Sequence, residues 1–326
     1  MSQDTLTLIT STGESRIDTV LGEVVGQFER AFPRRIMAYY VTGSWSSGTA
    51  LLNPSDLSNG SDIDLHIIFR DKLQPEDHQQ MGPVIGSCQR LCPIPLEVHA
   101  ADESALDGYW DVALKQRGLL LYGADIRDQV VLPSLEVHLQ RAMTYPPYTM
   151  AEVRGQFLSA QEEPHLEYPL AYPAPEHPFY GYTEPVGYIV PATGPTTGAI
   201  VSIATWAATI FLAVQAQCIV GTKRDAVEKH QQLIGDDWST LISEVFTKCR
   251  LSWRHGIPED AAAQVHLREM CERMLGLENH LLEVYRPYLI KWLGQEENKE
   301  FALRMLRMIR FSELSLQNKP RAMRGD

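Results

Sequence analysis

Two carboxylates in the first quarter of the chain have the spacing of a cation site. Asp62 and Asp64 alternate with Ile63 and Leu65, so a strand here places both acids on one face and apolar side chains on the other. Residues at i and i+2 of a strand have Cα atoms about 6.6 Å apart. Like charges this close are unfavourable unless a cation lies between them. The pair predicts a divalent cation site, and Mg²⁺ is the usual ion where phosphates also bind.

An Asp-x-Asp pair alone recurs by chance and is typical of a capped turn beside a solvated acid. Two neighbouring features favour a catalytic interpretation here. Gly43-Ser44 follows an apolar strand predicted over residues 36–41, and Glu97 lies within a second apolar strand, Pro95-Leu96-Glu97-Val98-His99. In chain order, these features are an apolar strand, a Gly-Ser turn and two strands that carry acids. This order predicts one site built from the turn and both acidic strands.

These residues resemble the polymerase-β-type nucleotidyltransferase superfamily, and within it the aminoglycoside nucleotidyltransferases of the streptomycin/spectinomycin adenylyltransferase kind. The resemblance covers roughly residues 36–135, and more loosely residues 197–255. The stretches that carry it are Gly43-Ser44, Ser61-Asp62-Ile63-Asp64-Leu65, Pro95-Leu96-Glu97-Val98, Leu119-Leu120-Leu121-Tyr122-Gly123 and a later segment from Thr205-Trp206 to Gly221-Thr222-Lys223.

The resemblance implies a role for each acid. Asp62 and Asp64 hold Mg²⁺, and Glu97 either joins the metal site or takes the proton from an attacking hydroxyl, a step that needs a positioned base. Gly43 and Ser44 contact the phosphates of ATP, because glycine lets the backbone approach closely and amides in a tight turn attract anions. Which of its two roles Glu97 plays is left open.

Three further residues are weighed against simpler interpretations. Lys223 matches a lysine that contacts phosphate in the resembled family, and an ammonium group suits a triphosphate; the alternative is a surface lysine after a helix stop at Gly221. His66 and His99 share strand faces with Asp64 and Glu97. We expect them to be hydrogen-bonded supporting or core histidines rather than metal ligands.

The pattern of elements predicts an α+β N-terminal nucleotidyltransferase domain, with a small mixed sheet and helices on one side, followed by an all-α helical bundle. The predicted domains are residues 1–145, catalytic; 146–196, a linker rich in proline and tyrosine; and 197–326, a helical substrate-binding or lid domain. Prolines of the linker predict irregular structure from residue 144 onward, with a short helix over residues 150–160.

Two features bear on location. Residues 199–220 are almost continuously apolar and long enough to span a membrane, yet they include Ser202, Thr205 and Gln215. A helix apolar on all sides is also typical of the centre of a bundle, which we expect here. The five cysteines are scattered without zinc-like spacing and no signal peptide is apparent, so free thiols in the cytoplasm are predicted.

The net charge of −12 disfavours binding to nucleic acid and does not conflict with a cationic small substrate. The predicted function is Mg²⁺-dependent transfer of AMP from ATP to a hydroxyl of a small polar molecule, for which the resemblance suggests an aminoglycoside-type antibiotic. Two alternatives stay open. One is nucleotidylation of a protein or RNA, as in toxin–antitoxin pairs, and the other is a non-catalytic nucleotide-binding protein of the same fold.

Overall fold

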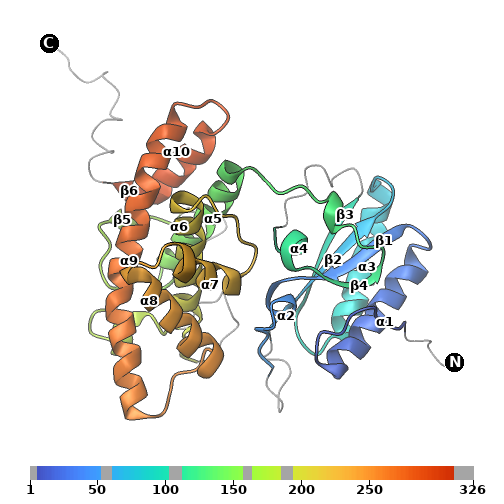
Figure 1. Cartoon of the computed structure of the whole chain (residues 1–326), viewed down its shortest axis with the longest axis horizontal. Helices are drawn as coiled ribbons and strands as arrows, with labels where there is room; N and C mark the ends of the chain where they lie inside the picture. Colours follow the sequence, from blue (N-terminus) through green and yellow to red (C-terminus); the bar gives the residue numbers. More distant parts are fainter. Residues whose placement is uncertain (1–5, 53–60, 103–111, 157–163, 185–193, 312–326) are drawn as a thin grey trace. The chain divides into compact units, whose positions relative to one another are not determined.

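A computed structural model of the chain describes residues 6–52, 61–102, 112–156, 164–184 and 194–311. The chain divides into two compact units (Figure 1). Unit 1 comprises Met1–Ser134 with Ile219–Asp225, and unit 2 comprises Leu135–Cys218 with Ala226–Asp326. Strands and helices together make the chain α+β. The asparagine-, serine- and glycine-containing stretch over residues 51–60 predicts a loop, and residues 53–60 of it lie outside the described residues.

Unit 1 is built on a four-stranded mixed sheet. The strand order is β3-β2-β1-β4, with β1 antiparallel to both of its neighbours and β2 parallel to β3. Its elements are α1 (Ser15–Ala31), β1 (Ile36–Val41), α2 (Gly43–Ser46), β2 (Ile63–Phe69), α3 (Pro75–Leu91), β3 (Leu96–Asp102), α4 (Val112–Arg117), β4 (Leu119–Gly123) and η3 (Arg127–Gln129).

The two faces of this sheet are covered by different residue clusters. The alternating residues Ile63, Leu65 and Ile67 of β2 are fully buried in the main core, which they share with α1 and α3. A smaller cluster that includes Leu114 of α4 covers part of the opposite face, so the helices are not confined to one side as the sequence predicted (Figure 1). The face opposite the main core is therefore the one that can present polar side chains.

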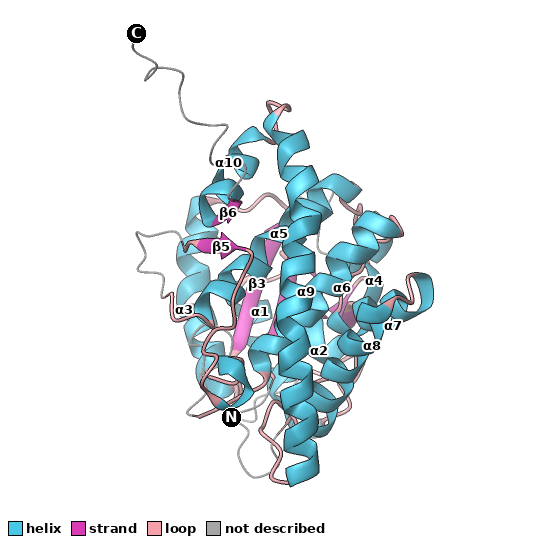
Figure 2. Ribbon diagram, turned by 90° about the vertical axis from the view of Figure 1, so that its left-hand side faces the viewer, coloured by secondary structure: helices cyan, strands magenta, loops and turns pink. Residues whose placement is uncertain are grey.

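Unit 2 is mostly helical. Its elements are α5 (Leu135–Glu152), β5 (Leu166–Tyr168), η4 (Pro178–Gly181), α6 (Gly198–Gln215), most of α7 (Lys223–Leu233), α8 (Asp237–Glu244), the π-helix η5 (Val245–Ser252), α9 (Ala261–Leu293), α10 (Lys299–Met308) and β6 (Ile309–Phe311). The prediction of an all-α unit is wrong in one respect, because β5 and β6 pair in parallel (Figure 2). Segments of three residues are too short to show a strand periodicity.

Helix α6 is the apolar centre of unit 2. Its mean hydropathy of 1.7 and its 18 residues meet the length and composition test for a membrane span, but 83% of it is buried within the protein. It packs against α5, α8, α9 and η5. A buried helix of this kind is expected to be apolar all round, so the packing supports the core interpretation.

Helix α5 continues through two prolines. Pro146 and Pro147 lie inside it, so the prediction that prolines exclude a helix here is wrong, and the predicted boundary after residue 145 falls within α5. Pro147 lacks the N–H that would bond the carbonyl of Met143. The buried hydroxyl of Tyr285 on α9 donates to that carbonyl instead, at 2.9 Å. A distant side chain thus supplies the hydrogen bond that the proline removes.

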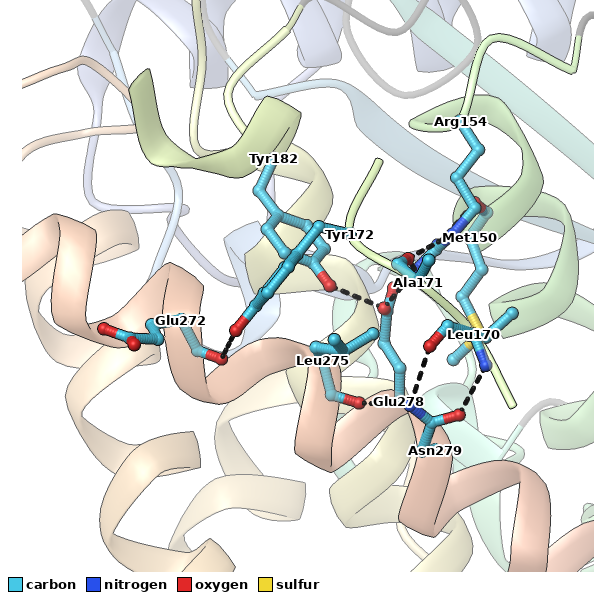
Figure 3. Close-up of polar contacts among 10 residues, drawn as sticks. All are labelled: Met150, Arg154, Leu170, Ala171, Tyr172, Tyr182, Glu272, Leu275, Glu278 and Asn279. Carbon is cyan, nitrogen blue, oxygen red and sulfur yellow. Dashed lines mark hydrogen bonds and ion pairs between the residues drawn. The ribbon is translucent and has the colours of Figure 1, made fainter. Parts of the chain in front are cut away.

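A buried ion pair joins the end of α5 to α9 (Figure 3). Arg154 donates to both carboxylate oxygens of Glu278, at 2.6 and 3.2 Å, and Glu278 is fully buried. Tyr182 donates to the same carboxylate at 2.6 Å. Burial, then the charge of Glu278, raises the pKa of the Tyr182 phenol, which keeps it a donor.

The irregular chain between β5 and η4 is fixed to the same place. Arg154 donates to the carbonyl of Ala171, and Asn279 on α9 exchanges hydrogen bonds with both backbone groups of Leu170 (Figure 3). A segment without regular structure must satisfy its backbone groups in this way. Side chains of α9 therefore order part of the proline- and tyrosine-rich stretch.

We expect Tyr285→Phe to lower the free energy of unfolding by about 1–3 kcal/mol, because it leaves the buried carbonyl of Met143 without its donor. Urea denaturation measures the change, with Tyr288→Phe on the same helix as the control. In a Pro147→Ala background the restored N–H can donate to Met143, so Tyr285→Phe should cost less there. An equal cost in both backgrounds would contradict the assignment.

We expect Arg154→Met to destabilise the protein by about 3–5 kcal/mol, because Glu278 would stay buried as an uncompensated charge. Arg310→Met is the matched control. It removes an ion pair with Glu167 whose side chains are 52% and 70% exposed, and exposed pairs contribute at most about 1 kcal/mol. Thermal and urea unfolding of both variants tests the difference, and similar losses would show that burial is not the deciding factor.

Candidate functional site

The strands β2 and β3 repeat one pattern, an acid followed two residues later by a histidine. Because the strands are parallel and in register, Asp64 lies beside Glu97 and His66 beside His99. All four side chains are on the sheet face opposite the main core, since Leu65 and Val98 between them pack into that core. The register therefore gathers two acids and two imidazoles in a single patch.

Three of these groups converge. Ligand atoms of Asp64, Glu97 and His99 all lie within 4.8 Å of one another, a distance that one metal ion can bridge. His99 Nε2 is 4.0 Å from Glu97 Oε2, and the two side chains are 47% and 61% exposed. Both lie on β3, which ends the strand order, whereas Asp64 on β2 is half-buried.

The two histidines differ in burial. His66 is buried and its Nε2 shares a 3.0 Å hydrogen bond with the hydroxyl of Thr42, as expected of a core histidine. His99 stacks on it, with ring centroids 4.8 Å apart and planes 27° from parallel. The expectation that His99 is a supporting residue rather than a metal ligand stays a prediction; one of its ring nitrogens lies within 4.8 Å of a ligand atom of each carboxylate.

The Gly-Ser turn lies directly against this patch. Gly43 has φ +66, and a Cβ built on it would lie 2.2 Å from Asp64 Oδ2. The backbone beside it is tied to the strand, since the N–H of Thr42 donates to the carbonyl of Asp64 at 3.0 Å. Only glycine allows both this left-handed conformation and this approach to a carboxylate. The predicted proximity of Gly43 to the acidic strand is therefore present.

Ser44, the next residue, lies in the first turn of α2. Its Oγ is buried and, among the described residues, has no hydrogen-bond partner. Its carbonyl accepts from the N–H of Thr49 at 2.9 Å. Buried hydroxyls normally have a partner, so a buried Oγ with none is consistent with an external ligand or water at this position.

Asp62 precedes β2 and is exposed. Its carbonyl accepts from the indole N–H of Trp45 at 2.9 Å, which fixes the start of the strand to α2. Its side chain is not one of the three that converge, which are those of Asp64, Glu97 and His99. The role of Asp62 as a second metal ligand stays a prediction.

Lys223 begins α7, within the short segment that belongs to unit 1. Gly221 was expected to stop the preceding helix, but α6 ends at Gln215. Gly221 instead packs on α4, where an added Cβ would lie 2.4 Å from the backbone nitrogen of Ala113. Gln116 on α4 holds the same segment by bonds to the carbonyl of Ile219 and the N–H of Gly221.

Charged groups complete the attachment of this segment. Arg117 on α4 donates twice to Asp225, at 2.6 and 3.1 Å. Arg224 donates to the carbonyl of Ser47, in the turn that follows α2. The backbone that carries Lys223 is thus fixed next to the Gly-Ser turn region, and contact of its ammonium group with phosphate stays a prediction.

The fold and site define an α+β chain with an acidic and imidazole cluster at a sheet edge, next to a glycine turn. No protein-family model matches the chain, and no curated protein matches it in sequence. Among solved structures it is similar to spectinomycin adenyltransferase AAD(9) from Enterococcus faecialis, crystallised with ATP and spectinomycin. The two are 11% identical, the match covers 78% of this chain and 98% of that chain, and the TM-score is 0.35. Likeness at this level transfers no residue role.

We expect Gly43→Ala to lower the free energy of unfolding by more than the strain of a left-handed alanine alone, because Asp64 must also move away from the new Cβ. Gly155→Ala is the control, since Gly155 has φ +69 and nothing within 4 Å of an added Cβ. The control should lose about 1–2 kcal/mol of unfolding free energy, and Gly43→Ala more. Equal losses in urea denaturation would mean that the turn does not press on the carboxylate.

Proposed function

We propose that the protein is a Mg²⁺-dependent nucleotidyltransferase that transfers AMP from ATP to a hydroxyl group of a small polar molecule. One observation carries the proposal: Asp64 and Glu97 lie side by side on parallel strands while Gly43 presses against Asp64. The motif resemblance in the same stretches supports it. An aminoglycoside-type antibiotic is the acceptor class that the resemblance suggests.

The residues present fit a divalent cation and a triphosphate. Carboxylate oxygens are the ligands that Mg²⁺ prefers, and Asp64 with Asp62 would hold it. Bound there, Mg²⁺ would neutralise charge on the phosphates and help align them for displacement. Gly43 and Ser44 would bind phosphate oxygens; the left-handed glycine backbone and the unpartnered Oγ of Ser44 support this, and Lys223 would add a positive charge.

Glu97 is proposed as the base. Its side chain is 61% exposed at the sheet edge, where an acceptor can reach it, and it adjoins Asp64. In the transfer, the acceptor oxygen forms a bond to the α-phosphorus of ATP while the bond from that phosphorus to the bridging oxygen breaks. Glu97 takes the hydroxyl proton, and pyrophosphate leaves. The protein's part in such a transfer is positioning and stabilisation of charge rather than covalent chemistry.

We expect Asp64→Asn to reduce AMP transfer by at least about 100-fold, because it removes a charged carboxylate ligand of the Mg²⁺ ion that would neutralise the triphosphate. Glu97→Gln should reduce it by about 100-fold or more through loss of the base. Asp71→Asn, an exposed acid just beyond β2, is the control. Transfer of label from α-³²P-ATP and release of pyrophosphate are measured together, and full activity of Asp64→Asn would overturn the assignment.

The acceptor panel in this assay separates the alternatives. It contains aminoglycosides, total cellular protein and total RNA, each with ATP and Mg²⁺. Label on a small molecule supports the proposal. Label retained on protein or RNA would replace the acceptor class and keep the chemistry, whereas ATP binding without pyrophosphate release under every condition would leave a nucleotide-binding protein.

A further inference from the structure

The repeated acid-x-histidine pattern brings an imidazole into the proposed cation site. Ligand atoms of Asp64, Glu97 and His99 lie within 4.8 Å of one another. Among the residues that the structure describes, no other three acidic, histidine or cysteine side chains meet this distance. The donor set is therefore two carboxylates and one nitrogen.

We propose that Asp64, Glu97 and His99 form a site for a first-row transition-metal dication of the Zn²⁺ and Co²⁺ kind, distinct in preference from Mg²⁺. Any effect of this ion on turnover rests on the proposed nucleotidyl transfer. Binding of the ion to the protein does not depend on that proposal. A Mg²⁺ ion that arrives with the triphosphate keeps mostly water and phosphate ligands. In the nucleotide-free protein Asp64, Glu97 and His99 would bind the transition-metal ion; in the proposed transfer Asp64 would instead hold Mg²⁺ with Asp62, and Glu97 would act as the base.

Ligand chemistry decides the preference. Mg²⁺ takes oxygen ligands in octahedral geometry and gains little from an imidazole nitrogen, whereas histidine is a good ligand for Zn²⁺ and its neighbours. For a site with nitrogen and oxygen donors, affinity rises from Mn²⁺ to Co²⁺ and onward along the first-row series. Three protein ligands also leave open positions, as in catalytic zinc sites.

The surroundings fix the backbone of all three ligands and contact the side chains of Asp64 and His99. Asp64 and Glu97 are held on paired strands, and Gly43 lies against Asp64. The ring of His99 stacks on that of His66, which Thr42 holds through its hydroxyl. Ligands on strands with supported rotamers keep their geometry better than ligands on loops. His66 is thus a positioning residue for His99.

The cysteine pair in unit 1 is a poor competitor for the same ions. Cys88 and Cys92 are free and lie one turn apart on α3. Burial raises the pKa of the Cys88 thiol to about 12 and that of Cys92 to about 11. A thiol must lose its proton to bind a metal, so these two are unfavourable ligands near neutral pH.

The test measures metal binding directly on the full chain after treatment with a chelator. CoCl₂ and MgCl₂ are titrated separately by calorimetry, and Co²⁺ is also followed by its visible absorption. We expect one Co²⁺ per chain, with ligand-field bands and no thiolate charge-transfer band. His99→Gln should weaken Co²⁺ binding by at least about tenfold, the scale on which metal sites respond to altered ligation.

Two further variants sharpen the result. His99→Asp makes an all-carboxylate site and should lose Co²⁺ affinity while retaining or gaining Mg²⁺ affinity. His78→Gln removes an exposed histidine from α3 and should change neither. Equal Co²⁺ affinity in the wild type and His99→Gln, or a thiolate charge-transfer band, would overturn the inference.

The two proposals fail in different ways. Suppose that the protein transfers AMP with Mg²⁺ and that His99→Asp does not change its relative affinity for Co²⁺ and Mg²⁺. This result would overturn the transition-metal site and leave the proposed function standing. Co²⁺ binding that depends on His99, in a protein that transfers no AMP, would support the site and overturn the function.

Discussion

The parallel register of β2 and β3 is the constraint on which the site depends. In a parallel pair, residues opposite each other present their side chains on the same face, so a shift by one residue would send Asp64 to one face and leave Glu97 on the other. The apolar residues on either side of Asp64 make such a shift costly, because Ile63 and Leu65 would leave the main core. Hydrophobic burial on one face thus enforces the crowding of negative charge on the other.

That crowding is tolerable because of where it occurs. Glu97 and His99 lie on the edge strand and are exposed, so water lowers the repulsion between carboxylates. Two residues further along β2, His66 is buried and shares a hydrogen bond with the hydroxyl of Thr42. Along two residues of each strand, the cluster passes from partly exposed acids to a buried imidazole.

Unit 2 solves a different problem, the satisfaction of polar groups inside an apolar helical core. Tyr285 bonds the carbonyl that Pro147 leaves without a donor. Glu278, fully buried, is neutralised by Arg154 and further bonded by Tyr182. The Met143 carbonyl and the Glu278 carboxylate thus each have a partner from a distant part of the sequence, as burial of a polar group requires. Such partnerships order irregular chain that its own sequence would leave without structure.

The sequence by itself determined the residue types of the candidate site and indicated the strands that carry them, because strand periodicity is a local property. The alternation around Asp62 and Asp64 predicted β2, and the apolar run over residues 36–41 predicted β1. Only the tertiary structure decided that His99 joins the acids and that Gly221 packs on α4. Strand register and helix packing depend on contacts between residues far apart in the chain, and no local pattern specifies them.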